Sequence, residues 1–400
     1  MRTMRWIVLA GALLSQSQAW GVEVFLINGW RFSGDARLTP KTVYVRLGTA
    51  TKEIPRGSVR AIELSPGEQI ECAKMKAALG MAAEGYFKLG KWLEGKCQFP
   101  EAAKQFEKAL LLDKDHAGAR SALGYERNGD GWVKSEEKTL QLHSLWLGPE
   151  GARACFELAK KFRETGDEKG VEKMLRQALI ALPTHPDALA MMMPITDKYV
   201  SKNKYRLPVD GLWAVMTDYN GHHKKTAFMA YALDMVKLDE NFRASAVQNP
   251  QKVEDMYTWG QPIYAAADGT VSSIKDGSQD HPLGETGELW DSNMVCIDHA
   301  NGEQTSYGHL QKGSIVVKQG QKVKAGQLIA RAGNSGASMM PHLHWQLIDR
   351  DGIGLPMRFV DFIEVTRDGE KPVNEGRAYE EHVYRNRIPG AAEQKGGKVK

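Results

Sequence analysis

Cysteine and net charge are both scarce in this sequence. Only four cysteines stand among the 400 residues, and no two form the C-x-x-C pair of a zinc finger. We expect Cys72, Cys97, Cys155 and Cys296 to be buried free thiols, Cys296 within a strand. Lysine and arginine (53) exceed aspartate and glutamate (49) by only 4, which is too little to indicate a nucleic-acid partner.

The sequence also lacks an apolar run long enough to cross a membrane. The N-terminal run from Trp6 to Leu14 follows Arg2 and Arg5 and precedes a small-x-small site at Ala19. A bilayer span needs ~20 residues, whereas this arrangement is typical of a secretory signal peptide. We therefore expect residues 1–19 to be removed and the mature chain to be exported, to the periplasm, envelope or medium, without a membrane span.

Two common hydrolase motifs are absent as well. No H-E-x-x-H occurs, which excludes the helical zinc site of many metallopeptidases. No G-x-S-x-G occurs either, so a serine nucleophile on a strand-to-helix turn is not indicated.

The remaining composition is that of a globular protein, with 42% hydrophobic and 26% charged residues, and its length predicts two or three domains. From 22 to 65, short alternating apolar runs and the turn signal Asn28-Gly29 predict four or five strands in a small β-barrel-like module. This module carries no titratable cluster, so we expect it to serve in packing or docking.

From 68 to 198 the apolar residues recur at helical spacing. Seven positions from Tyr86 to Ala109 recur with the same spacing from Cys155 to Ala178, an offset of 155 − 86 = 69 residues. This offset is close to two 34-residue periods, and the pattern resembles tetratricopeptide repeats. Stacked helix pairs of that kind offer a concave surface, so we expect this region to bind a protein partner and to have no catalytic role.

Strand-like runs return from 204 to 365, separated by turn signals such as Asp268-Gly269 and Asn301-Gly302. They predict an antiparallel β-sheet domain, followed by a C-terminal extension at 366–400. The expected fold class is therefore multidomain α+β.

Histidines concentrate in this β-rich part, where His342 and His344 stand two residues apart. On a strand, residues i and i+2 point to the same face, so both imidazoles project together while Leu343 and Trp345 face the core. Two convergent imidazoles on a rigid strand suit a metal site. His299 is expected at a hairpin turn on the surface.

Several motifs follow one another in this domain. They are Tyr257-Thr258-Trp259-Gly260, Tyr307-Gly308-His309-Leu310, Gly333-Asn334-Ser335-Gly336 and Pro341-His342-Leu343-His344. The ordered series closely resembles the lysostaphin-type (LytM-domain) zinc metallopeptidases, over residues 210–365. The resemblance implies an enzyme that cleaves peptide bonds in bacterial cell-wall peptidoglycan with one zinc ion.

The same resemblance implies the roles of individual residues. Asp234, in Tyr231-Ala232-Leu233-Asp234, and His344 are the implied zinc ligands. His309 and His342 are the implied catalytic histidines, which would move a proton or stabilise the oxyanion.

One position departs from the family pattern. The first ligand usually stands four residues before the aspartate, where this sequence has Ala230. The nearest upstream histidines are His222 and His223, and we expect His223 to be the third ligand, with His222 as the alternative. Three protein ligands would leave a fourth position for water, as in catalytic zinc sites.

The sequence thus predicts an exported zinc endopeptidase acting on peptidoglycan peptides. Two alternatives stay open: a non-catalytic LytM-type regulator of other wall hydrolases, and a zinc peptidase with a secreted protein substrate. Specificity is expected to reside in loops such as 275–293.

Overall fold

The computed structural model describes residues 22–26, 31–38, 42–47, 50–55, 59–217, 221–366 and 369–387. The expected signal peptide and the Asn28-Gly29 turn lie outside these residues. The chain divides into two compact units, Met1–Leu182 and Pro183–Lys400.

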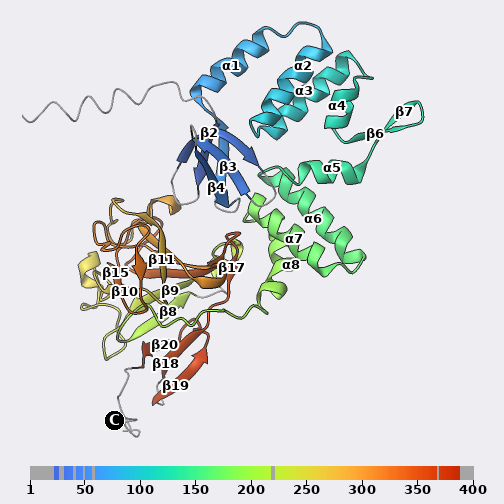
Figure 1. Cartoon of the computed structure of the whole chain (residues 1–400). Helices are drawn as coiled ribbons and strands as arrows, with labels where there is room; N and C mark the ends of the chain where they lie inside the picture. The colour runs from blue at the N-terminus through green and yellow to red at the C-terminus, as the bar shows by residue number, and fades with distance from the viewer. Residues whose placement is uncertain are drawn as a thin grey trace, which may run out of the picture. The chain divides into compact units, whose positions relative to one another are not determined.

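The first unit begins with a five-stranded antiparallel sheet in the order β4-β3-β2-β1-β5 (Figure 1). Its strands are β1 (Val22–Leu26), β2 (Arg31–Leu38), β3 (Thr42–Leu47), β4 (Ala50–Pro55) and β5 (Val59–Leu64). Alternate side chains such as Val43 and Val45 are fully buried in one small core. A small N-terminal β module is confirmed.

Helices follow the sheet. They are α1 (Pro66–Ala77), α2 (Ala83–Gly95), α3 (Phe99–Leu112), α4 (Ala117–Ala122), α5 (Glu136–His143), α6 (Pro149–Glu164) and α7 (Glu168–Ala181). Helices α2 and α3 pack closely because Gly90 has no side chain, and a Cβ there would lie 2.4 Å from the Phe106 ring. In α6 and α7, Ala159 and Leu175 are fully buried.

A β-hairpin interrupts the helices where the sequence predicts none. Strands β6 (Tyr125–Asn128) and β7 (Gly131–Lys134) pair between α4 and α5. Gly129 has a φ of +60°, a conformation that favours glycine, and this allows the chain to reverse in two residues.

The second unit begins with α8 (Pro186–Thr196) and continues into a large antiparallel sheet. Its order is β14-β11-β12-β13-β16-β9-β8-β20-β18-β19, with β17 beside β16, while β10 and β15 form a separate pair. The strands are β8 (Trp213–Thr217), β9 (Leu233–Lys237), β10 (Pro262–Tyr264), β11 (Gly269–Lys275), β12 (Met294–Asp298), β13 (Glu303–Gly308), β14 (Lys322–Val323), β15 (Leu328–Arg331), β16 (Leu343–Asp349), β17 (Gly354–Leu355), β18 (Phe359–Thr366), β19 (Gly369–Gly376) and β20 (Val383–Asn386). The expected antiparallel sheet is confirmed.

Aromatic side chains form the centre of this sheet's core. Trp213, Trp345, Tyr205, Tyr307 and Phe359 are each fully buried. Trp345 packs against Phe359 with ring centroids 4.8 Å apart, so β16 is anchored on its core side by a large ring.

The second unit extends beyond the expected range of 204–365 at both ends. Before it, the Tyr199 hydroxyl and the Lys202 backbone N–H donate hydrogen bonds to the buried Glu303 carboxylate, at 2.6 and 2.7 Å. After it, β19 and β20 continue the sheet into the segment expected to be an extension.

Several smaller expectations can be compared with the structure. None of the four cysteines forms a disulfide. Cys72, Cys155 and Cys296 are buried as expected, the last of them in β12, whereas Cys97 is only partly buried. Among the helices that the structure describes, none combines the length and hydropathy of a membrane span. The surface position expected for His299 is wrong: it is 7% exposed, because its ring nitrogens bind the Asp268 carbonyl and the Thr305 hydroxyl, both at 2.8 Å.

Candidate metal centre

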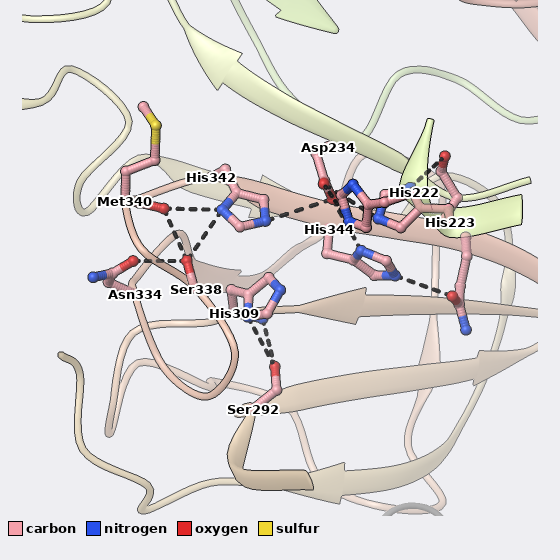
Figure 2. Close-up of polar contacts among 12 residues, drawn as sticks. His222, His223, Asp234, Ser292, His309, Asn334, Ser338, Met340, His342 and His344 are labelled. Carbon is pink, nitrogen blue, oxygen red and sulfur yellow. Dashed lines mark hydrogen bonds and ion pairs between the residues drawn. The ribbon is translucent and has the colours of Figure 1, made fainter. Parts of the chain in front are cut away.

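Asp234 lies on β9, in the middle of the large sheet (Figure 2). The neighbouring strands place Thr217 of β8 and His344 of β16 directly opposite it. Leu233 and Met235 point to the core, so the carboxylate emerges on the other face of the sheet. It is nevertheless only 5% exposed, since histidines surround it.

Two of these histidines come from the short 3₁₀ helix His222–Lys225. His223 Nε2 lies 3.2 Å from Asp234 Oδ2, and its side chain is 2% exposed. His222 Nε2 lies 4.0 Å from the same oxygen, and its side chain is 65% exposed. Successive residues of a 3₁₀ helix point about 120° apart, so the turn that buries His223 directs His222 outward.

The other two come from β16 and the residue just before it. His344 Nδ1 lies 2.9 Å from Asp234 Oδ1, and its Nε2 lies 3.0 Å from Gln346 Oε1. His342 Nε2 lies 3.5 Å from Asp234 Oδ1. Leu343 and Trp345 are fully buried. Both imidazoles therefore share one face, as the two-residue spacing predicts.

His342 is held by the segment that precedes it. Its Nδ1 lies 2.9 Å from the Met340 carbonyl oxygen and 3.1 Å from the Ser338 hydroxyl. A carbonyl only accepts, so Nδ1 carries a proton, and Nε2 is the ring nitrogen that faces Asp234. Ser338 in turn donates to Asn334 Oδ1 at 2.7 Å (Figure 2).

His309 follows β13 and has a φ of +56°, a conformation uncommon outside glycine. Its backbone N–H donates to Ser292 Oγ at 2.8 Å, and its Nδ1 donates to the Ser335 carbonyl at 2.7 Å. In the neutral ring Nε2 therefore carries the lone pair, and it makes no hydrogen bond to that carbonyl. The His309 ring centroid lies 4.5 Å from that of His342 and 5.7 Å from that of His344.

The electrostatics of the cluster follow from burial and from these contacts. Burial alone would raise the pKa of Asp234, but hydrogen bonds from His223, His342 and His344 outweigh it and hold the pKa well below its ordinary value. Burial, together with the positive charge that His342 and His344 can carry, lowers the pKa of His309 well below its ordinary value. His309 is thus neutral at neutral pH.

This donor set fits a zinc ion. Imidazole nitrogen and carboxylate oxygen are common zinc ligands, and a buried carboxylate ringed by imidazoles is ready to hold a cation. Ligand-capable atoms of His222, His223 and Asp234 lie within 4.8 Å of one another. His344 contacts the other carboxylate oxygen. We favour His344 over His222, because His344 is largely buried and oriented by Gln346 whereas His222 is mostly in solvent.

The sequence pattern indicated no role for the residues that hold these histidines. Ser292, Ser338 and Gln346 each contact one of them. Asn334 and Ser335 belong to a recognised motif, but their contacts depend on the fold of segments far apart in the chain. Only Gln346 carried a local signal, since it continues the alternation of His342 and His344 along the strand.

Comparison with known families places this site in context. Residues 253–354 match the family model "Peptidase family M23". The chain contains a peptidase family M23 domain. The matched residues include His309, His342 and His344, while His223 and Asp234 precede them.

Relatives of the M23 domain include enzymes of the bacterial cell wall. Peptidoglycan DD-endopeptidase ShyA of Vibrio cholerae is 34% identical over 141 residues, which cover 33% of this chain and 30% of ShyA. Cell division protein DipM of Caulobacter vibrioides is 33% identical over 88 residues, 22% of this chain and 12% of DipM. The chain therefore matches less than a third of either relative.

Among solved structures, a zinc-containing peptidase from Vibrio cholerae is 28% identical, with a TM-score of 0.20, over 30% of this chain and 37% of that one.

Proposed function

We propose that this protein is an exported zinc metalloendopeptidase that hydrolyses peptide bonds in bacterial cell-wall peptidoglycan. Two observations support the proposal. The M23 domain is similar to peptidoglycan DD-endopeptidases. Two ligand-capable histidines and His342 also gather around one buried carboxylate, and the His309 ring packs against that of His342.

In this proposal His223 Nε2, an Asp234 carboxylate oxygen and His344 Nδ1 hold the metal. A zinc ion, when bound, acts as a Lewis acid that polarises a peptide carbonyl and makes water more acidic. The low pKa of Asp234 keeps its carboxylate charged and able to bind a cation throughout the neutral range. Gln346 orients the His344 ring.

His309 is the proposed proton acceptor. It is neutral at neutral pH because its pKa is lowered, and its Nδ1–H is committed to the Ser335 carbonyl, so Nε2 can take a proton from water. His342, whose Nδ1–H is held by Met340, is the proposed partner. With a proton on Nε2 as well, it would stabilise the oxyanion and pass that proton to the leaving amine, and the proton that His309 takes from water would replace it.

The observation that carries the proposal is the gathering of His223, His342 and His344 on the Asp234 carboxylate. It is tested by incubating purified, zinc-loaded full-length protein with isolated peptidoglycan and with soluble cross-linked wall peptides. The wild type should release new amino termini, and His309→Ala should release few. A folded, zinc-loaded wild type that cleaves neither substrate while stimulating another wall hydrolase would instead identify a regulator.

A further inference from the structure

The side chains of His342, His344 and Gln346 occupy one face of β16 and the residue before it. Residues two and four apart on a strand share a face. The intervening Leu343, Trp345 and Leu347 are each fully buried in the core. Gln346 is itself 7% exposed, on a strand fixed on both sides by β13 and β9. A buried amide needs a hydrogen-bond partner, and here that partner is an imidazole.

The contact joins Gln346 Oε1 to His344 Nε2 at 3.0 Å. The other ring nitrogen, Nδ1, lies 2.9 Å from Asp234 Oδ1. A carboxylate only accepts, so without a metal Nδ1 carries a proton directed at Asp234. A metal ligand must offer a lone pair, and His344 can bind a cation at the Asp234 side only when Nδ1 is bare and the proton sits on Nε2.

An amide can pair with either state of the ring. Its oxygen accepts a hydrogen bond from Nε2–H, and its NH₂ group donates to a bare Nε2 after a rotation. An apolar side chain at this position could do neither and would leave a buried Nε2–H without a partner when the metal is bound.

We infer that Gln346 is a positioning residue that sets the affinity of the centre for zinc, by accepting a hydrogen bond from His344 Nε2–H while Nδ1 faces the cation. The inference rests on the zinc site of the proposed function. Groups that accept the second N–H of a metal-binding histidine typically change metal affinity by ~10–100-fold. Gln346 touches neither the carboxylate nor the other proposed ligands in the contacts of the described residues.

Gln346→Met removes the acceptor at nearly constant volume, and Gln346→Glu keeps it. Gln304→Met is the matched control, because Gln304 lies on the adjacent strand β13 and bonds Ser272 and Asp298 away from the site. Each full-length protein is stripped of metal and titrated with zinc against a competing chelator of known affinity. The melting temperature of the zinc-free form shows whether each variant folds, and Gln346→Leu is the substitute if Gln346→Met does not.

We expect Gln346→Met to bind zinc ~10–100-fold more weakly than the wild type. Gln346→Glu should stay within a few-fold of the wild type, and Gln304→Met should match it. Equal affinity of folded Gln346→Met and wild type would overturn the inference while leaving the zinc site intact. A wild type that takes up no zinc would overturn the proposed function as well, so the two failures are distinguishable.

Discussion

Asp234 is the residue on which the site is built, since four imidazoles lie within 4.0 Å of its carboxylate. Two of them belong to the 3₁₀ helix His222–Lys225, and the other two belong to β16 and the residue just before it. His223 stands eleven residues before Asp234 rather than four, yet its ring reaches the same carboxylate. A ligand is therefore available although Ala230 occupies the position of the usual histidine.

The two adjacent histidines should differ sharply in importance. His223→Ala should lose most bound zinc and lower kcat/KM by ~10²-fold or more, because the metal contribution amounts to several kcal/mol. His222→Ala should behave like the wild type, since this side chain is mostly exposed. Zinc titration and peptide cleavage of both variants measure this. The reverse pattern would move the ligand by one residue.

Variants of the two proposed catalytic histidines should show a loss of catalysis without a loss of bound metal. His309→Ala and His342→Ala should keep most of the zinc and yet lose ~10²–10⁴-fold in kcat, as expected for proton transfer and oxyanion stabilisation. Metal content and single-turnover cleavage are measured on the same samples. Parent-like rates in both zinc-loaded variants would show that the division of roles is wrong.

At the scale of elements, the site depends on strands whose register is fixed by their core faces. Large aromatic side chains are buried on the core faces of β16 and β13. They prevent a one-residue shift in strand register, which would turn every histidine of the strand to the opposite face of the sheet. Glu303 also holds β13 in position. It accepts hydrogen bonds from the Tyr199 hydroxyl, the Lys202 and Asn203 backbone N–H groups, and the Tyr205 hydroxyl.

Glu303→Gln should therefore destabilise the second unit, by roughly 2–3 kcal/mol, because a carboxylate that accepts several bonds is replaced by a weaker acceptor carrying its own donors. The pKa of Glu303 lies below its ordinary value of 4.5, since these bonds outweigh the opposing effect of burial. Its contribution to stability is then present above pH about 4.5 and is lost as the pH falls through the lower, folded-state pKa.

Denaturant unfolding at a series of pH values measures this contribution. The wild type should lose stability relative to Glu303→Gln as the pH falls below 4.5. A constant difference between the two proteins at every pH would contradict the assignment.

How much of the structure could be predicted from the sequence also differs between elements. Period-two alternation predicted the same-face histidines of β16, because a strand fixes side-chain direction locally. The sequence could not predict the burial of His299, the support of His309 by Ser292, or the Glu303 contacts. Each of these joins residues whose proximity is decided by sheet order. The β6–β7 hairpin was missed because its four-residue strands are too short to show a period.

At the scale of the whole molecule, the chain consists of a β-and-helix unit and a unit that contains the M23 domain. We propose that the first unit recruits or restrains the peptidase through a protein partner on its helices, and that it contributes nothing to bond cleavage. The second unit begins at Pro183 rather than near residue 204, because Tyr231 donates to Asp197 at 2.9 Å and Tyr199 to Glu303.

Two fragments test this boundary. Residues 183–387 should fold, bind zinc and cleave soluble wall peptides at the rate of the full chain. Residues 204–387 lack α8 and the Tyr199, Lys202 and Asn203 groups that bond Glu303, and should melt about 5–10 °C lower. Thermal melting of zinc-free samples and peptide cleavage are the measurements. An inactive but zinc-loaded 183–387 would make the first unit part of the catalytic machinery.

The most direct test of the metal centre is the zinc content of the full-length protein after chelation and resupply. Elemental analysis of the desalted protein should give one zinc per chain for the wild type and close to none for His344→Ala, with His222→Ala retaining one. Stoichiometric zinc in folded His344→Ala, or none in the wild type, would contradict a centre formed by His223, Asp234 and His344.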